Sequence, residues 1–336
     1  MRVHARLPLA LAALTAAHVA ALAAPFLSPY DPTEQNRTLP YAPPTRVHMI
    51  DGAGRLHWRP FVYRMARRGD GEGYEEDRRR SYPVLLLARD VDLAGAARVH
   101  LFGVEEPARI FLLGSDGFGR DQLSRLLHGA RISLFAGLIA TALSLGLGWL
   151  LGTVAGYYGR WVDSVLMRSA ELFLALPWLY LLFAVRAVLP LRVSSGQAFL
   201  LLVLLIGLVD WARPARLFRG IVLSARERSY VLAARGFGAS DLYLIRRHIA
   251  PQTFGLLLTQ AALVAPQYVL AEVTLSFLGL GVSEPTPSWG NMLAALQQYH
   301  VLVSYWWMWV PGLALLAVSL AYYALSEVLH QAGSAE

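Results

Sequence analysis

The sequence of 336 residues contains neither cysteine nor lysine, and all 30 residues counted as Lys or Arg are arginine. Without cysteine the chain can form no disulfide, thiolate metal ligand or cysteine nucleophile. Without lysine it lacks the side chain that a Walker A loop places on nucleotide phosphates, and the amine that a Schiff base requires. If the protein works with ATP, another chain must therefore bind the nucleotide.

Charged residues are also scarce, at 16% of the chain against about 25% in average soluble domains. Hydrophobic residues make up 56%, the mean hydropathy is +0.43, and the apolar residues fall in long runs. A transmembrane helix needs about 20 mostly apolar residues. We predict an all-α polytopic membrane protein with six transmembrane helices, at residues 7–27, 132–156, 172–189, 198–212, 254–279 and 305–325.

The first of these segments also resembles a signal peptide. Arg2 and Arg6 form a basic start, and Ala21-Leu22-Ala23 is similar to a cleavage site. The apolar stretch is nevertheless longer than the usual core of a signal peptide. We therefore favour a membrane helix within residues 1–30, with cleavage as the alternative.

Arginine placement predicts the orientation of the chain. Residues 213–252 hold eight arginines and two acids, whereas residues 282–304 have no arginine and one acid. Because short loops rich in basic residues stay in the cytoplasm, we place residues 212–252 and both termini inside and residues 31–113 outside. Trp306, Trp307 and Trp309 then lie at the outer headgroup level.

Residues 31–113 are rich in proline, arginine and acids and contain short β-prone runs. The turn at residues 51–54, which contains Asp51-Gly52, predicts a hairpin between strands at 45–50 and 55–63. Residues 83–87 and 99–102 are further candidate strands, and the charged run 67–80 predicts a solvated loop tip. We expect a small β-containing extracytoplasmic insert that either caps a neighbouring subunit or contacts a partner protein. Its histidines have no ligand-like spacing, and its nearly balanced charge argues against a nucleic-acid partner.

The second predicted span carries a small residue at every fourth position. The stripe consists of Ala136, Ala140, Ser144, Gly148, Gly152 and Gly156. Small residues on one helix face let two backbones approach closely in lipid. The stripe predicts tight packing inside this chain or, alternatively, an interface with a second transmembrane subunit around a pathway.

Glu272 lies deep within a predicted span. A charge in the membrane interior is costly, so such residues face protein or water. Glu272 therefore either lines a water-filled path or braces a neighbouring helix. The spans hold few carboxylates, which argues against a secondary carrier driven by protons.

The cytoplasmic segment 212–252 predicts two short helices. Residues 221–235 favour a helix, the run Gly236-Phe237-Gly238 ends it, Ser240 caps the next helix, and Pro251 ends that one. Small residues leave a nearly bare surface at the turn, which suits docking in a groove of another protein. From these residues alone, a pair of interfacial amphipathic helices is the alternative.

This segment resembles the coupling region of ATP-binding-cassette (ABC) importer permeases. Their pattern is Glu-Ala-Ala, three residues, Gly, and a Pro thirteen positions later. Ala233-Ala234, Gly238 and Pro251 match this spacing. Leu232 stands where the pattern has glutamate, which removes any polar contact from that position.

Four further stretches closely resemble the dipeptide/oligopeptide/nickel permeases, in the branch of the C-type subunit. They are LSPYDP (27–32), LGSDGFGRDQLSRLLHGARISL (113–134), AGYYGRWVDSVLMR (155–168) and LSFLGLGVSEPTPSWGNML (275–293). Most of the insert, about residues 41–110, lies outside the resemblance. The resemblance implies the type I ABC importer permease fold in a bacterial inner membrane, with an N-terminal helix (1–30), an extracytoplasmic subdomain (31–113), a core (114–330) and a tail (331–336).

The resemblance also implies an assembly. A second, different permease subunit, two ATPase subunits that bind ATP and Mg²⁺, and an extracytoplasmic solute-binding protein would complete the importer. This chain would bind no cofactor and hold no catalytic residue. Peptides are the expected cargo, with nickel or another small solute as the alternative. A membrane-anchored enzyme is a further alternative, but the outer segment has no HExxH or paired-carboxylate signature.

Two sets of residues follow as functional candidates. The set expected to receive the nucleotide-driven movement is Val231, Leu232, Ala233, Ala234, Arg235, Gly236, Phe237, Gly238, Ala239, Ser240, Asp241 and Pro251. The set expected on the translocation path or in helix packing is Gly148, Gly152, Gly156 and Glu272.

Overall fold

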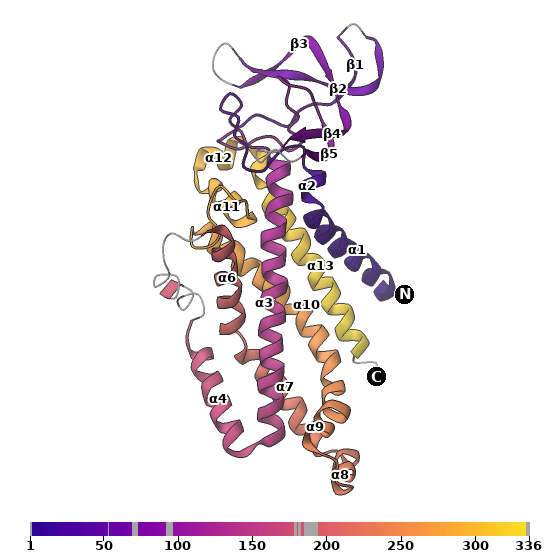
Figure 1. Ribbon diagram of the computed structural model, residues 1–336, viewed down its shortest axis with the longest axis vertical. Helices are drawn as coiled ribbons and strands as arrows, with labels where there is room; N and C mark the ends of the chain where they lie inside the picture. The colour runs from indigo at the N-terminus through magenta and orange to yellow at the C-terminus, as the bar shows by residue number, and fades with distance from the viewer. Residues whose placement is uncertain are drawn as a thin grey trace. The chain divides into compact units, whose positions relative to one another are not determined.

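The computed structural model describes residues 2–52, 54–68, 73–91, 97–177, 180, 183–184 and 194–333. The chain forms two compact units. The first unit comprises Met1–Leu14, Phe135–Glu272 and Val318–Glu336, and the second comprises Thr15–Leu134 and Val273–Ala317. Helices α1, α3, α10 and α13 each contribute residues to both units, and the elements are labelled in Figure 1.

Most of the described chain is helical, as the sequence predicts. The α-helices are α1 (Arg2–Leu22), α2 (Ala24–Leu27), α3 (Gln122–Tyr158), α4 (Arg160–Ala175), α6 (Ser195–Val209), α7 (Ala212–Arg226), α8 (Ser229–Gly236), α9 (Asp241–Leu244), α10 (Ala250–Phe277), α11 (Trp289–Ala294), α12 (Tyr299–Ser304) and α13 (Val310–Gly333). A π-helical turn, η1 (Ile245–Ile249), joins α9 to α10. Two short 3₁₀ segments, η2 (Ala295–Gln297) and η3 (Trp306–Trp309), follow α11 and α12.

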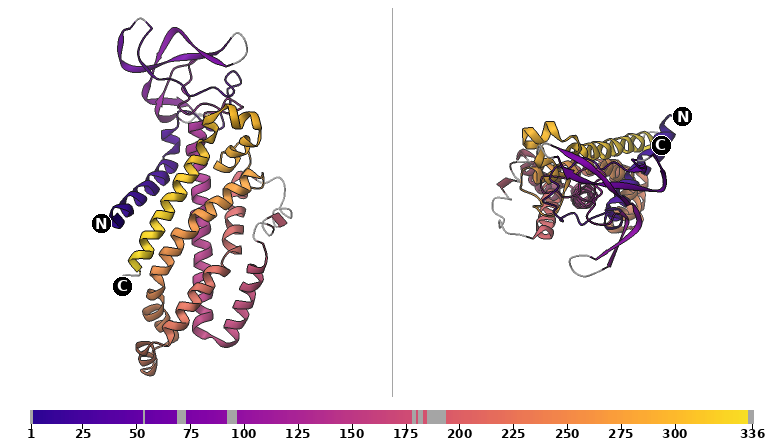
Figure 2. Two further views of the ribbon diagram at one scale, coloured as in Figure 1. Left: turned by 180° about the vertical axis from the view of Figure 1, so that it is seen from behind. Right: turned by 90° about the horizontal axis from the view of Figure 1, so that it is seen from above.

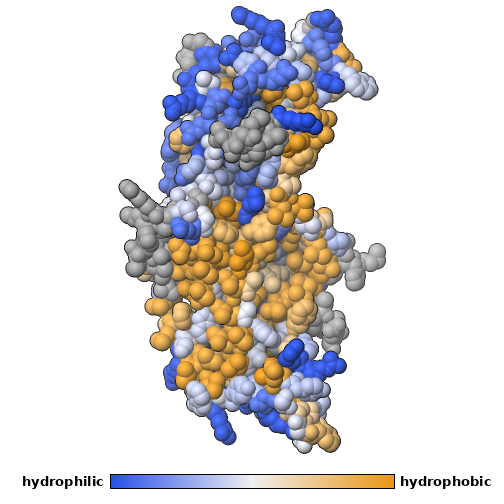
Figure 3. Space-filling view, in the orientation of Figure 1, coloured by the Kyte–Doolittle hydropathy of each residue, from blue (hydrophilic) through white to orange (hydrophobic). Residues whose placement is uncertain are grey.

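Among the described residues, three helical segments are long and apolar enough to cross a membrane: Gln122–Tyr158, Asp241–Phe277 and Trp306–Gln331. The apolar helices Leu7–Leu22 and Phe199–Val209 are shorter. Half of the predicted span 172–189 lies outside the described residues, and its first four residues, 172–175, form the end of α4, which stops at Ala175. On the face drawn in Figure 3, hydrophobic side chains gather over the helices, which matches the class of a mostly helical membrane protein.

The strands all belong to the second unit. Strands β1 (His48–Ile50), β2 (Leu56–Arg67) and β3 (Tyr74–Pro83) form an antiparallel sheet in the order β1-β2-β3, and β4 (Leu85–Val91) pairs with β5 (Ala97–Gly103). The predicted hairpin is confirmed: the backbone N–H of Arg55 donates to the Asp51 carboxylate at 2.9 Å, and Gly54 has a φ of +79°. The predicted loop tip at 67–80 is wrong over Tyr74–Arg80, which belongs to β3. Backbone pairing with β2 supports this strand despite its charged side chains.

Two helix boundaries in the cytoplasmic segment also differ from the sequence prediction. Residues 221–235 do not form one helix, because α7 ends at Arg226 and α8 begins at Ser229. Pro251 does not end a helix, because α9, η1 and α10 run on as Asp241–Phe277. Pro251 is the second residue of α10 and follows the π-helical turn, so the turn before the proline departs from regular α-helical geometry.

Candidate functional site

The α8–α9 segment (residues 229–244) is anchored within the first unit by an apolar cluster. Val231 on α8 and Leu244 on α9 are buried with Tyr157, Val222 and Ile249. Ala234 and Ala239 pack against the same cluster. Within the first unit, Figure 1 and Figure 2 show α8 and α9 next to the C-terminal end of α3.

The turn between α8 and α9 is built by glycine and serine. Gly238 has a φ of +85°, a conformation that favours glycine, and it reverses the chain after α8. Ser240 caps α9, because its hydroxyl accepts a hydrogen bond from the backbone N–H of Tyr243 at 3.4 Å. The predicted turn and cap are therefore present.

The opposite face of the α8–α9 segment is exposed and apolar. The ring of Phe237 at the tip is 93% exposed, and Leu242 and Tyr243 are also exposed. Leu232, at the position of the missing glutamate, is half-exposed. The small residues do not form this surface by themselves, since Ala234 and Ala239 face the buried cluster. The sequence interpretation missed that large apolar side chains surround the turn.

A group of polar side chains, which the sequence interpretation also missed, joins the turn to α3. The Tyr157 hydroxyl donates to the Asp241 carboxylate at 2.6 Å, and Arg235 donates to the Tyr157 oxygen at 3.0 Å. Arg235 and Asp241 lie 3.5 Å apart. From α7, Arg226 donates to the backbone oxygens of Gly156 and Tyr157 at 3.0 and 3.2 Å.

The predicted glycine stripe faces α7. A Cβ atom at Gly148 would lie 2.7 Å from Pro214, and one at Gly152 would lie 2.4 Å from the backbone oxygen of Ala215. At Gly156 the nearest atom would be the backbone oxygen of Arg219, at 2.8 Å. These glycines therefore allow α3 and α7 to pack backbone to backbone.

Glu272 on α10 is fully buried. One turn earlier, the Tyr268 hydroxyl lies 2.8 Å from the Ser144 hydroxyl and 2.9 Å from the Asp210 carboxylate. Asp210 and Tyr268 line a cavity of about 130 Å³ between α6 and α10. Polar side chains from α3, from α10 and from the residue that follows α6 thus gather within the first unit.

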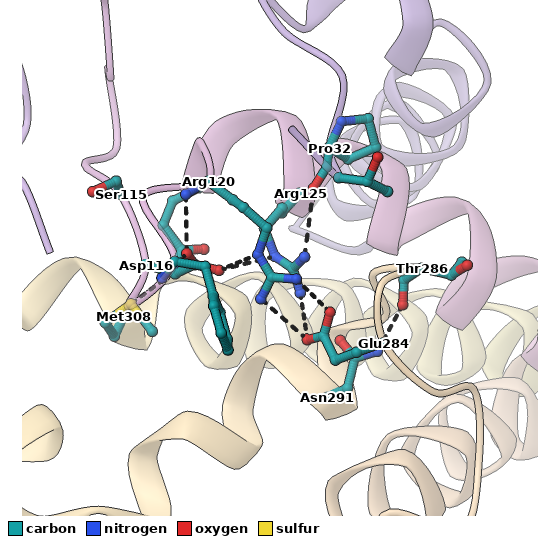
Figure 4. Close-up of polar contacts among 12 residues, drawn as sticks. Pro32, Ser115, Asp116, Arg120, Arg125, Glu284, Thr286, Asn291 and Met308 are labelled. Carbon is teal, nitrogen blue, oxygen red and sulfur yellow. Dashed lines mark hydrogen bonds and ion pairs between the residues drawn. The ribbon is translucent and has the colours of Figure 1, made fainter. Parts of the chain in front are cut away.

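The second unit holds a partly buried charge cluster, drawn in Figure 4. Arg120 donates to Asp116 at 2.7 Å and to Glu284 at 2.6 Å, and Arg125 donates to Glu284 at 2.8 Å. Arg125 is only 1% exposed, so its charge depends on these partners. The sequence interpretation quoted both stretches that carry these residues, 113–134 and 275–293, but assigned no role to the four charges.

Asp121 lies beside this cluster and accepts hydrogen bonds from the backbone and the hydroxyl of Ser124 at 2.8 and 2.6 Å. Burial raises the pKa of Asp121 from 3.8 to about 6. Among the described residues, no group of three or more His, Asp or Glu side chains is arranged to hold a metal ion.

The fold and these sites fit a membrane permease, and comparison with known proteins identifies the family. Residues 148–332 match the family of binding-protein-dependent transport system inner membrane components. This match covers more than half of the chain, so the chain belongs to that family. It is therefore a permease component in the inner membrane.

Two relatives illustrate the similarity. The dipeptide transport system permease protein DppC of Bacillus subtilis is 35% identical over 227 residues, which cover 67% of this chain and 69% of the relative. The di/tripeptide transport system permease protein DppC of Pseudomonas aeruginosa is 39% identical over 222 residues, which cover 66% and 71%. A solved structure of the inward-facing MetNI methionine ABC transporter matches with a TM-score of 0.41 and 18% identity, over 61% of this chain and 95% of that one.

Proposed function

We propose that this chain is the transmembrane permease subunit of an ABC importer that moves peptides of the dipeptide or oligopeptide class into the cytoplasm. The names of its relatives support the cargo. The absence of lysine means that ATP hydrolysis belongs to separate ATPase subunits. The alternatives are nickel or another small solute with the same architecture and, with less support, a secondary carrier.

The proposed topology has six spans, with both termini in the cytoplasm and residues 31–113 outside. The three long apolar helices of the described residues support three of these spans, and we assign two more to the shorter apolar helices Leu7–Leu22 and Phe199–Val209. The sixth proposed span, residues 172–189, lies only partly within the described residues. The arginine-rich segment 213–252 supports the cytoplasmic placement of α8 and α9.

The proposed assembly pairs this chain with a second permease subunit, two ATPase subunits and an extracytoplasmic solute-binding protein. The observation that carries it is the exposed apolar face of the α8–α9 segment, with Phe237 at its tip. Exposed aromatic side chains on an anchored segment are typical of protein interfaces. The occupant we propose is an ATPase subunit, whose closure on ATP would move the docked segment. Bound ATP and Mg²⁺ would lie on that subunit.

The test is Phe237→Ala in the purified complete transporter. A buried aromatic anchor contributes about 2 kcal/mol or more to an interface, so the affinity for the ATPase subunit should fall about thirtyfold. ATP-driven uptake of labelled dipeptides in proteoliposomes should fall with it. Phe254→Ala is the matched control, because Phe254 is also an exposed phenylalanine but lies on α10, away from the turn.

Three results would contradict the proposal. Unchanged ATPase binding in Phe237→Ala would refute the docking surface, and uptake without ATP would favour a secondary carrier. Uptake of nickel in place of dipeptides would refute the cargo while leaving the assembly intact.

A further inference from the structure

The α8–α9 segment is joined to α3 through three side chains, Arg235, Tyr157 and Asp241, here called the polar link. Arg235 ends α8, Asp241 begins α9, and Tyr157 lies at the C-terminal end of α3. All three pairs are in contact, at 3.0 Å for Arg235 to Tyr157, 2.6 Å for Tyr157 to Asp241 and 3.5 Å for Arg235 to Asp241. The three side chains of the polar link therefore all contact one another across the turn.

The stability of the polar link depends mainly on Tyr157. Arg235 and Asp241 have half-exposed side chains, and an ion pair between two such groups contributes little by itself. Tyr157 is only 5% exposed and belongs to the apolar cluster that holds Val231 and Leu244. A largely buried hydroxyl that loses its partners carries a desolvation cost, so Tyr157 favours the arrangement in which both charged residues stay in place.

The C-terminal ends of α3 and α7 contact each other next to the polar link. Arg226 places a positive charge on the last carbonyl oxygens of α3, where a helix favours cations. Gly156 packs against the backbone of α7 one residue before Tyr157. The α8–α9 segment, the end of α7 and the end of α3 therefore share one set of contacts.

We propose that the polar link is the positioning element that makes the α8–α9 segment and α3 move together. This inference rests on the proposed coupling function of that segment. The position where the family pattern has glutamate holds Leu232, whose side chain cannot donate or accept a hydrogen bond. Arg235 and Asp241 supply the polar contacts to α3 instead. Displacement of the tip by a docked ATPase then displaces the C-terminal end of α3 as well.

The first test is Tyr157→Phe in the complete transporter. The ring is retained, with its packing and with the Arg235 guanidinium 5.4 Å above it, and only the hydroxyl is lost. We expect ATPase activity to persist and the uptake per ATP hydrolysed to fall about tenfold, since the hydrogen bonds removed involve charged groups. Tyr158→Phe is the matched control, because the Tyr158 ring is half-exposed and its hydroxyl makes no hydrogen bond among the described residues.

The second test measures the motion directly. Because the chain has no cysteine, spin labels can be placed at Leu150→Cys on α3 and Gly236→Cys at the turn, in a complex whose other subunits lack reactive cysteines. Leu150 is exposed, and a side chain at Gly236 meets open space. We expect one narrow distance distribution with and without trapped nucleotide, and a broad one after Tyr157→Phe.

Asp241→Asn separates positioning from folding. Asparagine still accepts the Tyr157 hydrogen bond but loses the charge that faces Arg235, so the uptake per ATP should lie between wild type and Tyr157→Phe. Unchanged coupling and a narrow distance in Tyr157→Phe would overturn the proposal. Equal loss of ATPase activity, uptake and complex in both variants would overturn it too, because that pattern reports unfolding. If wild type itself shows no ATP-coupled uptake, the proposed function fails instead.

Discussion

Replacing Gly152 with alanine tests how closely α3 and α7 must pack. The added Cβ would lie 2.4 Å from the backbone oxygen of Ala215 and 3.1 Å from its Cα. Ordinary contacts between such atoms are about 3.5 Å or longer, so one helix must shift by about 1 Å. The obstructing atoms are backbone, which means that no side-chain rotation can relieve the overlap.

Gly146 on the same helix provides the matched control, because a Cβ there meets nothing within 4 Å. Both substitutions gain about 1 kcal/mol of helix propensity. Only Gly152→Ala carries an overpacking cost, typically about 1–3 kcal/mol. We therefore expect Gly146→Ala to be neutral or slightly stabilising, and Gly152→Ala to be less stable than Gly146→Ala by about 1–3 kcal/mol.

The assay is thermal unfolding of the purified transporter in mild detergent, followed by intrinsic tryptophan fluorescence. The midpoint of Gly152→Ala should lie below that of Gly146→Ala, and its uptake activity should fall in parallel. Equal midpoints for the two variants would show that α3 and α7 do not approach as closely as the stripe requires, and would refute the packing argument.

The charged groups of the second unit give two further predictions. Glu284→Gln removes the carboxylate shared by Arg120 and Arg125 and should lower the free energy of unfolding by about 2–3 kcal/mol. The loss is smaller than for a fully buried ion pair because Glu284 is half-exposed. The midpoint of thermal unfolding measures this loss, and an unchanged midpoint would show that the cluster does not stabilise the fold. The raised pKa of Asp121 means that the folded state holds its proton up to about pH 6, whereas the unfolded chain releases it near pH 4. Its contribution to stability is therefore full below about pH 4 and lost as pH rises through about 6. Asp121→Asn should remove this pH dependence. The difference in unfolding midpoint between the variant and wild type should therefore change between pH 4.5 and pH 7.5. An equal difference at both pH values would contradict the prediction.

The sequence predicted those parts of the fold that depend on local pattern. The β1–β2 hairpin follows from Asp51-Gly52, because that pair fits a tight turn. The long apolar helices follow from uninterrupted runs of apolar residues. The cap at Ser240 follows from the spacing of a hydroxyl before a helix.

The errors occurred where distant parts of the chain decide the structure. Tyr74–Pro83 looks solvated by itself, yet pairing with β2 makes it a strand. Pro251 looks like a helix end, yet it lies in α10, which follows directly on the π-helical turn Ile245–Ile249. The cluster of Arg120, Arg125 and Glu284 joins residues more than 150 positions apart, which no local pattern can bring together.

The polar link shows why matching the coupling motif residue by residue was not enough. The motif assigns its polar contact to the glutamate position, so Leu232 suggested that this contact was lost. Gly238 changes that conclusion, because its φ of +85° reverses the chain between α8 and α9. Arg235 and Asp241, each three positions from Gly238, are thereby brought within 3.5 Å of one another and onto Tyr157. The glycine thus fixes which charged residues can meet α3, and the polar contact depends on the shape of the turn more than on the identity of residue 232.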